Sequence, residues 1–431
     1  MVATCKRWPR IGLLVAGLVL LLNGSPSVCA DEKADSLRAE LLKLNGASTE
    51  EIQTAKLRAL IKDRDKAKKA VAEAAKMMKE AKGGEKPFNY NGTIILGRAA
   101  QILRLFDIAE RFYEHQLDLA TKVKDGMKIV SAYEGLIEVY WDAKRYADVI
   151  DTCEKVVEAT APKEVENYKP FALERLIQAK AKQGKFDEAM TLTKNLLELD
   201  DGALAWYFLQ LKGWIQREDG KIGDAINTYK DALDKINAEK KMLKGEAKEK
   251  QKDRITYILS GLYVDNKEID KAAKELEILI KRNPEAATYK NDLGFIWCDH
   301  DLKLEESEKL IKEALELDKK EREKLKAEGK LDEVTENAAY LDSLGWVYYK
   351  QKKYKEALEP LKKAAVDEDE GNHLEIWDHL ADCYFAMGKK KDAVESWEKA
   401  LKMDEVSTRD GERRRKVSEK LKKAKLELSK E

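Results

Sequence analysis

Apolar residues recur three and four positions apart over most of this chain, in helix-length stretches that come in pairs. In the clearest pair, Leu344, Gly345 and Tyr348 share one face of a first helix. Ala357 and Leu361 share one face of a second helix. Gly345 and Ala357 are small, so the two backbones can approach closely, while larger neighbours fill the space beside them. The pattern therefore predicts two packed helices joined by a short polar turn.

The same pairing recurs along the chain, which is typical of a repeat protein. The position of the small residue falls at 97, 137, 177, 213, 260, 294, 345 and 381, with isoleucine in its place at 137 and 177. Repeats of this length are single supersecondary units that bury a continuous core only when they stack. About eight helix pairs are therefore expected between residues 87 and 407, the best of them at 287–319, 338–371 and 374–407.

The best copies resemble the tetratricopeptide family, in which an aromatic residue or leucine precedes Leu-Gly/Ala in the first helix and alanines recur in the second. The residues that carry this pattern, and that we expect to pack the repeats, are Leu293, Gly294, Leu344, Gly345, Tyr348, Ala357, Trp377, Leu380, Ala381, Tyr384, Ala393, Trp397 and Ala400. The resemblance, which is to exported bacterial members of the family, implies an all-α fold: a right-handed superhelical solenoid of helix-turn-helix repeats that binds proteins.

The segments on either side of the array are expected to be helical. Residues 31–86 predict an N-terminal helical hairpin, and residues 408–431 a basic helix that caps the open end of the solenoid. Two charged stretches predict helix pairs that extend past the solenoid body and turn at Gly245 and Gly329. These extensions are interpreted as solvated helix, with a docking antenna as the alternative.

Prolines give a further prediction about where helices end. Pro162, Pro170 and Pro284 are expected between repeats, where a helix should stop. Pro360 falls inside a predicted second helix.

Residues 1–30 have the pattern of a cleavable signal peptide. Lys6, Arg7 and Arg10 precede an apolar run over 11–22 that is too short to span a bilayer comfortably. Cleavage is expected after Ala30, which predicts a periplasmic or secreted protein. Lipid attachment at Cys29 is the disfavoured alternative, because the residue before it is a valine rather than a small residue.

The composition of the chain argues against nucleic-acid binding and against a disulfide-bonded fold. The chain has 81 basic and 81 acidic side chains, a balance that argues against nucleic-acid binding. Beyond the signal segment the cysteines are Cys153, Cys298 and Cys383, an odd and widely spread set that is interpreted as buried thiols rather than disulfides.

The sequence contains no motif that indicates catalysis: no Gly-rich phosphate loop, GxSxG, HExxH or CxxC. His379 and Cys383 lie four apart on one helix, so they could face one metal ion, but polar positions on a repeat helix are the preferred interpretation. We therefore predict no cofactor, no metal and no enzymatic activity. A helical metal-dependent enzyme remains an alternative, as does a structural component that self-associates through the charged extensions; the oligomeric state is open.

A stripe on the first helices is the predicted partner-binding strip, because aromatic residues alternate there with Asn and Asp. Its members are Asn291, Phe295, Asp299, Asp342, Trp346, Tyr349, Asp378, Asp382 and Phe385. Some family members hold a peptide carboxylate with Lys and Asn at such positions. The aspartates here indicate a basic or mixed ligand instead. The alternative is that Phe295 and Trp346 pack between adjacent repeats.

Overall fold

The structure of the protein is a computed structural model that describes residues 35–81, 86–159, 162–200, 202–239, 243–331, 333–367, 371, 373–403 and 408–429. Within these residues every regular element is a helix. The predicted signal peptide at 1–30 lies outside them. The described chain divides between residues 228 and 229 into two compact units.

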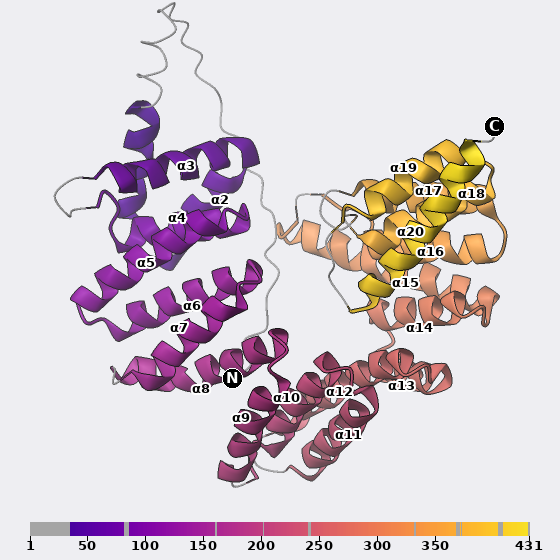
Figure 1. The fold of residues 1–431 in the computed structure, drawn as a ribbon, viewed down its shortest axis with the longest axis horizontal. Coiled ribbons are helices and arrows are strands. Elements are labelled where there is room, and N and C mark those ends of the chain that lie inside the picture. The colour runs from indigo at the N-terminus through magenta and orange to yellow at the C-terminus, as the bar shows by residue number, and fades with distance from the viewer. Residues whose placement is uncertain are drawn as a thin grey trace, which may run out of the picture. The chain divides into compact units, whose positions relative to one another are not determined.

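The unit up to residue 228 begins with a helix over 35–42 and continues in chain order (Figure 1). Its further elements are η1 (Lys43–Gly46), α2 (Glu50–Ile61), α3 (Arg64–Glu80), α4 (Tyr90–Ile102), α5 (Phe106–Lys122), α6 (Gly126–Asp142), α7 (Tyr146–Glu158), α8 (Lys163–Lys182), α9 (Phe186–Leu199) and α10 (Ala205–Glu218). Helix α11 (Ile222–Ala238) crosses the boundary between the units.

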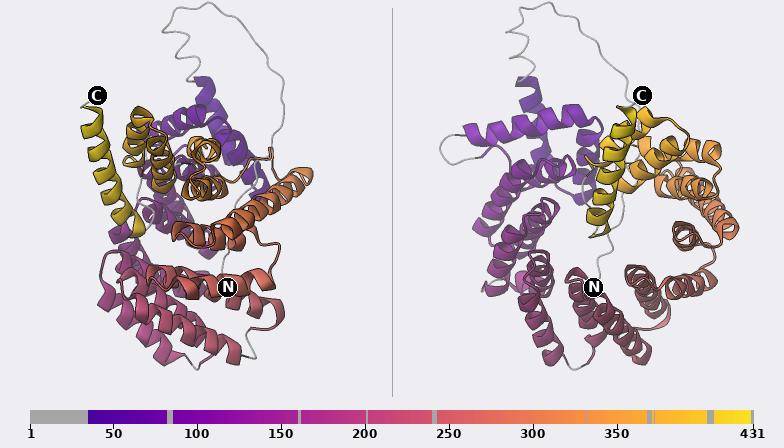
Figure 2. Two further views of the ribbon diagram at one scale, coloured as in Figure 1. Left: turned by 90° about the vertical axis from the view of Figure 1, so that its right-hand side faces the viewer. Right: turned by 45° about the vertical axis from the view of Figure 1, so that its right-hand side comes forward.

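The unit from residue 229 contains the better repeats. Its elements are α12 (Gly245–Asp265), α13 (Ile269–Arg282), α14 (Ala287–Asp299), α15 (Leu304–Ala327), α16 (Ala338–Lys350), α17 (Tyr354–Val366), α18 (Leu374–Ala386), α19 (Lys390–Ala400) and α20 (Thr408–Leu428). Figure 2 shows α20, in yellow, as a long straight helix beside α18 and α19. All eight predicted small positions fall in first helices, α4 through α18 in steps of two, so the all-α, tetratricopeptide-like helix-pair fold is confirmed.

The turn inside each pair shares one backbone form, to which the α14–α15 turn adds a second left-handed residue, Lys303. One residue takes a left-handed conformation, and the next N–H bonds back to a carbonyl five residues earlier, as Lys353 does to Tyr348 at 2.9 Å. This is the Schellman ending of an α-helix. In the described turns the left-handed residue is Gly184, Gly220 or Gly388 in three pairs and Arg104, Lys144, Lys267, Asp301 or Lys352 in five.

Close packing inside a pair depends on the small residue. A Cβ built on Gly345 would lie 2.4 Å from Cγ of Leu361 and 3.1 Å from the carbonyl oxygen of Ala357. No side chain fits there without displacing the second helix. Leu361 and Ala357 are both fully buried in the resulting core.

The N-terminal segment covers the first helix pair with apolar side chains. Helix α3 contacts α4 and α5 and buries Ala67, Val71, Ala74 and Met78. Asn45 of η1 ties this segment to the residues that precede α4, because its side-chain amide donates to the carbonyl of Pro87 at 2.9 Å. The segment holds a helix over 35–42, the short η1 and two longer helices rather than a single hairpin.

One prediction about helix ends is wrong. Pro170 lies inside α8 instead of between repeats, because α8 begins at Lys163. Val165 and Tyr168, which precede the proline, are buried, and their burial favours helix ahead of it. Pro360 does lie inside α17, and α15 does end just before Gly329, which is left-handed.

Candidate partner-binding face

The predicted strip lies on the first helices α14, α16 and α18 of the second unit. Its buried members are Asn291, Asp342, Trp346 and Asp378. Its partly exposed members are Phe295, Asp299, Tyr349, Asp382 and Phe385. The buried four therefore contact neighbouring helices, and only the other five present surface to a partner. Partner binding by these residues stays a prediction.

Trp346 links three first helices. Its indole stacks on the imidazole of His379 with centroids 3.9 Å apart and planes 12° apart, and on Tyr349 at 4.8 Å. Its Nε1 donates to Oδ1 of Asp299 on α14 at 3.1 Å. Only 8% of the residue is exposed, so Trp346 packs between adjacent repeats, and Phe295 packs against the same cluster.

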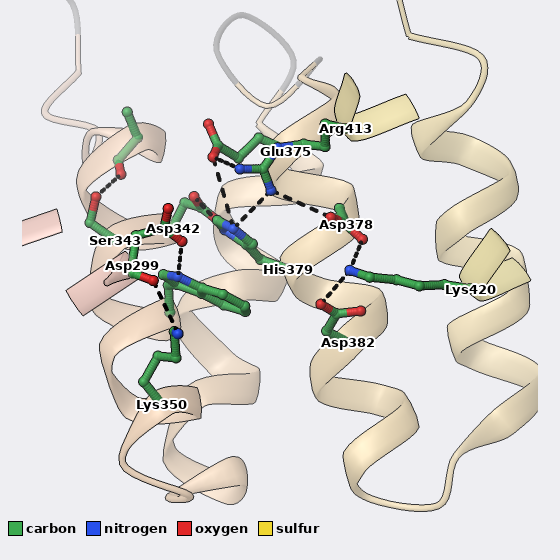
Figure 3. A network of polar contacts seen from close by, with 12 residues as sticks. Asp299, Asp342, Ser343, Lys350, Glu375, Asp378, His379, Asp382, Arg413 and Lys420 are labelled. Carbon is green, nitrogen blue, oxygen red and sulfur yellow. Dashed lines mark hydrogen bonds and ion pairs between the residues drawn. The ribbon is translucent and has the colours of Figure 1, made fainter. Parts of the chain in front are cut away.

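His379 is the buried centre of a polar network that runs from α16 to α20 (Figure 3). Its Nδ1 lies 3.0 Å from both carboxylate oxygens of Asp342, and its Nε2 lies 3.3 Å from Nη1 of Arg413 and 4.0 Å from Glu375. Burial alone would lower the pKa of His379. The charge of Asp342 and its hydrogen bond outweigh burial and Arg413, so the pKa is raised above its ordinary value.

Asp378 is the other centre of the network. It accepts from Nε1 of Trp397 at 3.0 Å, from Nζ of Lys420 at 2.8 Å and from Nη1 of Arg413 at 3.4 Å. Lys420 also bonds Asp382 at 2.7 Å. Burial, followed by the nearby charge of Asp378, raises the pKa of Asp382. The same two carboxylates overcome burial and raise the pKa of Lys420.

The sequence predicts a basic capping helix over 408–431 but not the ion pairs that α20 makes with α18. Arg413 pairs with Glu375 as well as with Asp378, so the basic helix meets the acidic positions of α18 within the same chain. A signal was available in the spacing of Arg413, Val417, Lys420 and Ala424, which places two cations and two apolar residues on one face of a helix.

No metal centre is found among the described residues. Both ring nitrogens of His379 face polar groups of the network, and Cys383 is buried with its Sγ 3.4 Å from the carbonyl oxygen of Tyr354. Cys153 and Cys298 are buried free thiols too, and burial raises the pKa of each.

The predicted packing residues occupy the interior or its edge. Those that are buried are Leu293, Gly294, Gly345, Ala357, Leu380, Ala381, Ala393, Trp397 and Ala400. Those that are partly exposed are Leu344, Tyr348, Trp377 and Tyr384. Among the latter, Trp377 carries the ammonium of Lys399 4.6 Å above its ring, so its outer face is covered by a cation.

The long helix α15 borders a hollow of about 690 Å³. Its lining alternates in charge: Glu305, Glu308, Lys309, Lys312, Glu313, Glu316 and Lys320 come from α15, joined by Lys290 and Glu285. Such mixed charges are typical of a solvated helix surface. In the described residues, no helix is at once long and apolar enough to cross a membrane.

Comparison with known proteins gives one family match and several similar solved structures. Residues 323–400 match the family described as anaphase-promoting complex, cyclosome, subunit 3. A tetratricopeptide repeat protein from Parabacteroides merdae is 15% identical over 66% of this chain and 98% of its own, with a TM-score of 0.44. A thermophilic TPR protein of Thermus thermophilus is 18% identical over 49% and 98%, with a TM-score of 0.36. A human IFIT1 dimer with m7Gppp-AAAA is 15% identical over 92% and 86%, with a TM-score of 0.45. No curated protein matches the chain.

Proposed function

Since the repeats of this chain are of the tetratricopeptide type, we propose that it is a non-catalytic scaffold that binds a partner protein on α14, α16 and α18. The observation that carries the proposal is the set of partly exposed aromatic residues on neighbouring first helices, Phe295, Tyr349 and Phe385. Aromatic side chains lose little entropy on binding and are enriched among residues that dominate interface energetics.

The buried network beneath these residues supports the proposal. Trp346 and His379 join α14, α16 and α18 through stacking and hydrogen bonds, so the surface above them is held in one arrangement before a partner arrives. A surface that is already ordered avoids part of the entropy cost of association. Asp299 and Asp382 at the edge of the aromatic residues favour a basic partner.

A pair of matched variants tests the proposal. Tyr349→Ala combined with Phe385→Ala removes two partly exposed rings from the first helices, whereas Ile278→Ala removes an exposed apolar side chain from the second helix α13. Crosslinking in the native host followed by mass spectrometry identifies the partner, and calorimetry with the purified partner gives the affinity. We expect the double variant to bind at least tenfold more weakly, because each hot-spot truncation costs roughly 1 kcal/mol or more. Equal affinity for the double variant and the wild type would reject this face.

We further propose that the chain acts outside the cytoplasm. The argument is the sequence pattern of residues 1–30. N-terminal sequencing of the native protein tests it. A mature protein that begins at Asp31 supports export, and one that retains the first thirty residues contradicts cleavage.

A further inference from the structure

Helix α20 occupies the place that the first helix of one more repeat would take. It contacts α19 and α18 in the way that α18 contacts α17 and α16. The polar contacts repeat as well, because Asp342 of α16 meets His379 of α18 just as Asp378 of α18 meets Lys420 of α20. The acidic face of the first helix α18 is therefore covered by α20, which is not followed by a second helix among the described residues.

Apolar burial contributes little to the attachment of α20. Among its described side chains only Val417 and Ala424 are buried, with Leu421 and Leu428 partly so, whereas α18 buries five apolar residues. Since apolar stabilisation follows the area removed from water, α20 gains less from its core contacts than a repeat helix does.

Cationic side chains of α20 supply the rest of the attachment, through ion pairs and through hydrogen bonds from Arg414 to the carbonyls of Leu401 and Met403. Lys420 bonds Asp378 and Asp382 at 2.8 and 2.7 Å, and Arg413 pairs with Glu375. At the outer edge Lys425 pairs with Glu398 of α19 at 2.6 Å. The side chains of Lys420 and Arg413 stay 35% and 25% exposed, so water and salt reach these pairs.

The face beneath α20 needs a cation. Glu375, Asp378 and Asp382 lie at positions one turn apart on α18, and Asp378 keeps only 4% of its side chain exposed. Three carboxylates this close repel one another and lose hydration when covered by an apolar surface. An occupant of this face must therefore bring basic side chains.

We propose that α20 is an intramolecular ligand on the acidic face of α18, defined as Glu375, Asp378 and Asp382, and that a basic amphipathic helix of the partner displaces it. The inference rests on the proposed scaffold function and names the chemistry of its partner. The pattern to be matched is that of α20 itself: Arg413, Val417, Lys420 and Ala424, with two cations seven residues apart and small apolar residues beside them.

A peptide with the sequence of residues 408–428 serves as the probe, labelled for fluorescence anisotropy. Three full-length chains are compared: the wild type, Arg413→Glu with Lys420→Glu, and a matched control, Arg415→Glu with Lys423→Glu, whose residues lie exposed on α20. The first double variant repels its own α20 but leaves the face of α18 intact. We expect it to bind the peptide at least tenfold more tightly than the wild type, while the control behaves as the wild type does.

Two further measurements establish specificity. A peptide in which the lysine at position 420 is replaced by glutamate is expected to lose binding, and salt raised from 50 to 300 mM is expected to weaken binding of the unmodified peptide. If the charge-reversed chain loses its helical circular dichroism, the milder Arg413→Gln with Lys420→Gln takes its place. A folded variant that binds the peptide no better than the wild type overturns the proposal, since α20 is then a permanent cover.

Light scattering tests whether α20 of a second copy of the chain, rather than a partner protein, occupies the acidic face of α18. A wild-type dimer that dissociates in the Arg413→Glu, Lys420→Glu variant would show α20 exchanged between two copies and would overturn the assignment to a partner. The scaffold proposal is judged separately: a partner whose affinity depends on Tyr349 and Phe385 but is equal in the wild type and the α20 variant supports the scaffold and rejects the displacement of α20.

Discussion

The two ends of the helix array are covered by helices of opposite character. At the N-terminal end α3 buries Ala67, Val71, Ala74 and Met78 against the first pair. At the C-terminal end α20 is held mainly by charged side chains. Every solenoid exposes an unpaired apolar face at its ends, and the two covers meet this need differently. Screening by salt weakens exposed ion pairs but not the burial of apolar side chains, so the C-terminal cover is expected to depend on salt more strongly than the N-terminal one.

Magnitudes support this distinction. Full burial of a side chain such as Val71 is worth about 1.5–3 kcal/mol. A partly exposed ion pair such as that of Lys420 contributes about 0–1 kcal/mol. The C-terminal cover therefore needs several pairs acting together to match a few buried aliphatic residues.

The largest expected effect is that of a charge inside the N-terminal cover. Val71→Asp places a carboxylate where the side chain has no exposure, and we expect it to lower the free energy of unfolding by about 4 kcal/mol. Urea denaturation followed by circular dichroism measures the loss, with the exposed Lys68→Asp on the same helix as control. A loss below about 1 kcal/mol would show that α3 can detach as freely as α20.

The second-largest expected effect is the removal of Asp378, the carboxylate at the centre of the contacts between α18 and α20. Asp378→Ala leaves the indole N–H of Trp397 without its acceptor and two cations without their shared partner, which is expected to cost about 2–3 kcal/mol. Asp378→Asn keeps an acceptor oxygen and should recover part of the loss in the same denaturation assay. If both variants are as stable as the wild type, Asp378 does not hold α20.

Salt distinguishes the two covers without a mutation. Raising sodium chloride from 50 mM to 0.5 M screens the pairs of Arg413 and Lys420 and is expected to weaken the protection of α20 by about 1 kcal/mol. Hydrogen exchange resolved by peptide gives the value for α20 and α3 in one experiment. Equal loss of protection in both helices would contradict the comparison.

The smallest expected effect is that of pH on His379. Asp342 and Glu375 raise its pKa in the folded state, against burial and Arg413. The stabilisation is therefore complete below the unfolded value of about 6.5 and is lost as pH rises through the raised value. Thermal melting at pH 6 and pH 9 should show this decline in the wild type, and a smaller one in His379→Gln. An identical decline in both would place the titrating group elsewhere.

The repeat pairs could be predicted from sequence because their signals are local. Small residues such as Gly345 and Ala357 recur at equivalent positions of successive pairs. The periodicity that places them is a property of each helix alone. The side chains of the candidate face could not be assigned in this way. Trp346 and Asp378 are buried by neighbouring helices, and which neighbour covers a given side is decided only when the repeats stack.

The helix that precedes Pro170 escaped prediction for a related reason. The rule that proline ends a helix weighs one lost hydrogen bond, whereas Val165 and Tyr168 gain burial against other helices. Likewise, the sequence predicts a basic cap at residues 408–431, but the acidic positions that it meets on α18 are identified only when the helices have packed. In both cases long-range packing overrides a local preference.

The left-handed turns described above leave room for thermal improvement. Positions such as Lys267 and Lys352 hold a side chain in a backbone conformation that glycine adopts freely, at a cost of roughly 1 kcal/mol each. Three other turns of the described chain already use glycine there. Introducing it at the remaining ones offers a way to make a heat-resistant version of the protein, and each exchange removes one charged side chain from a turn while leaving the aromatic residues of the candidate face in place.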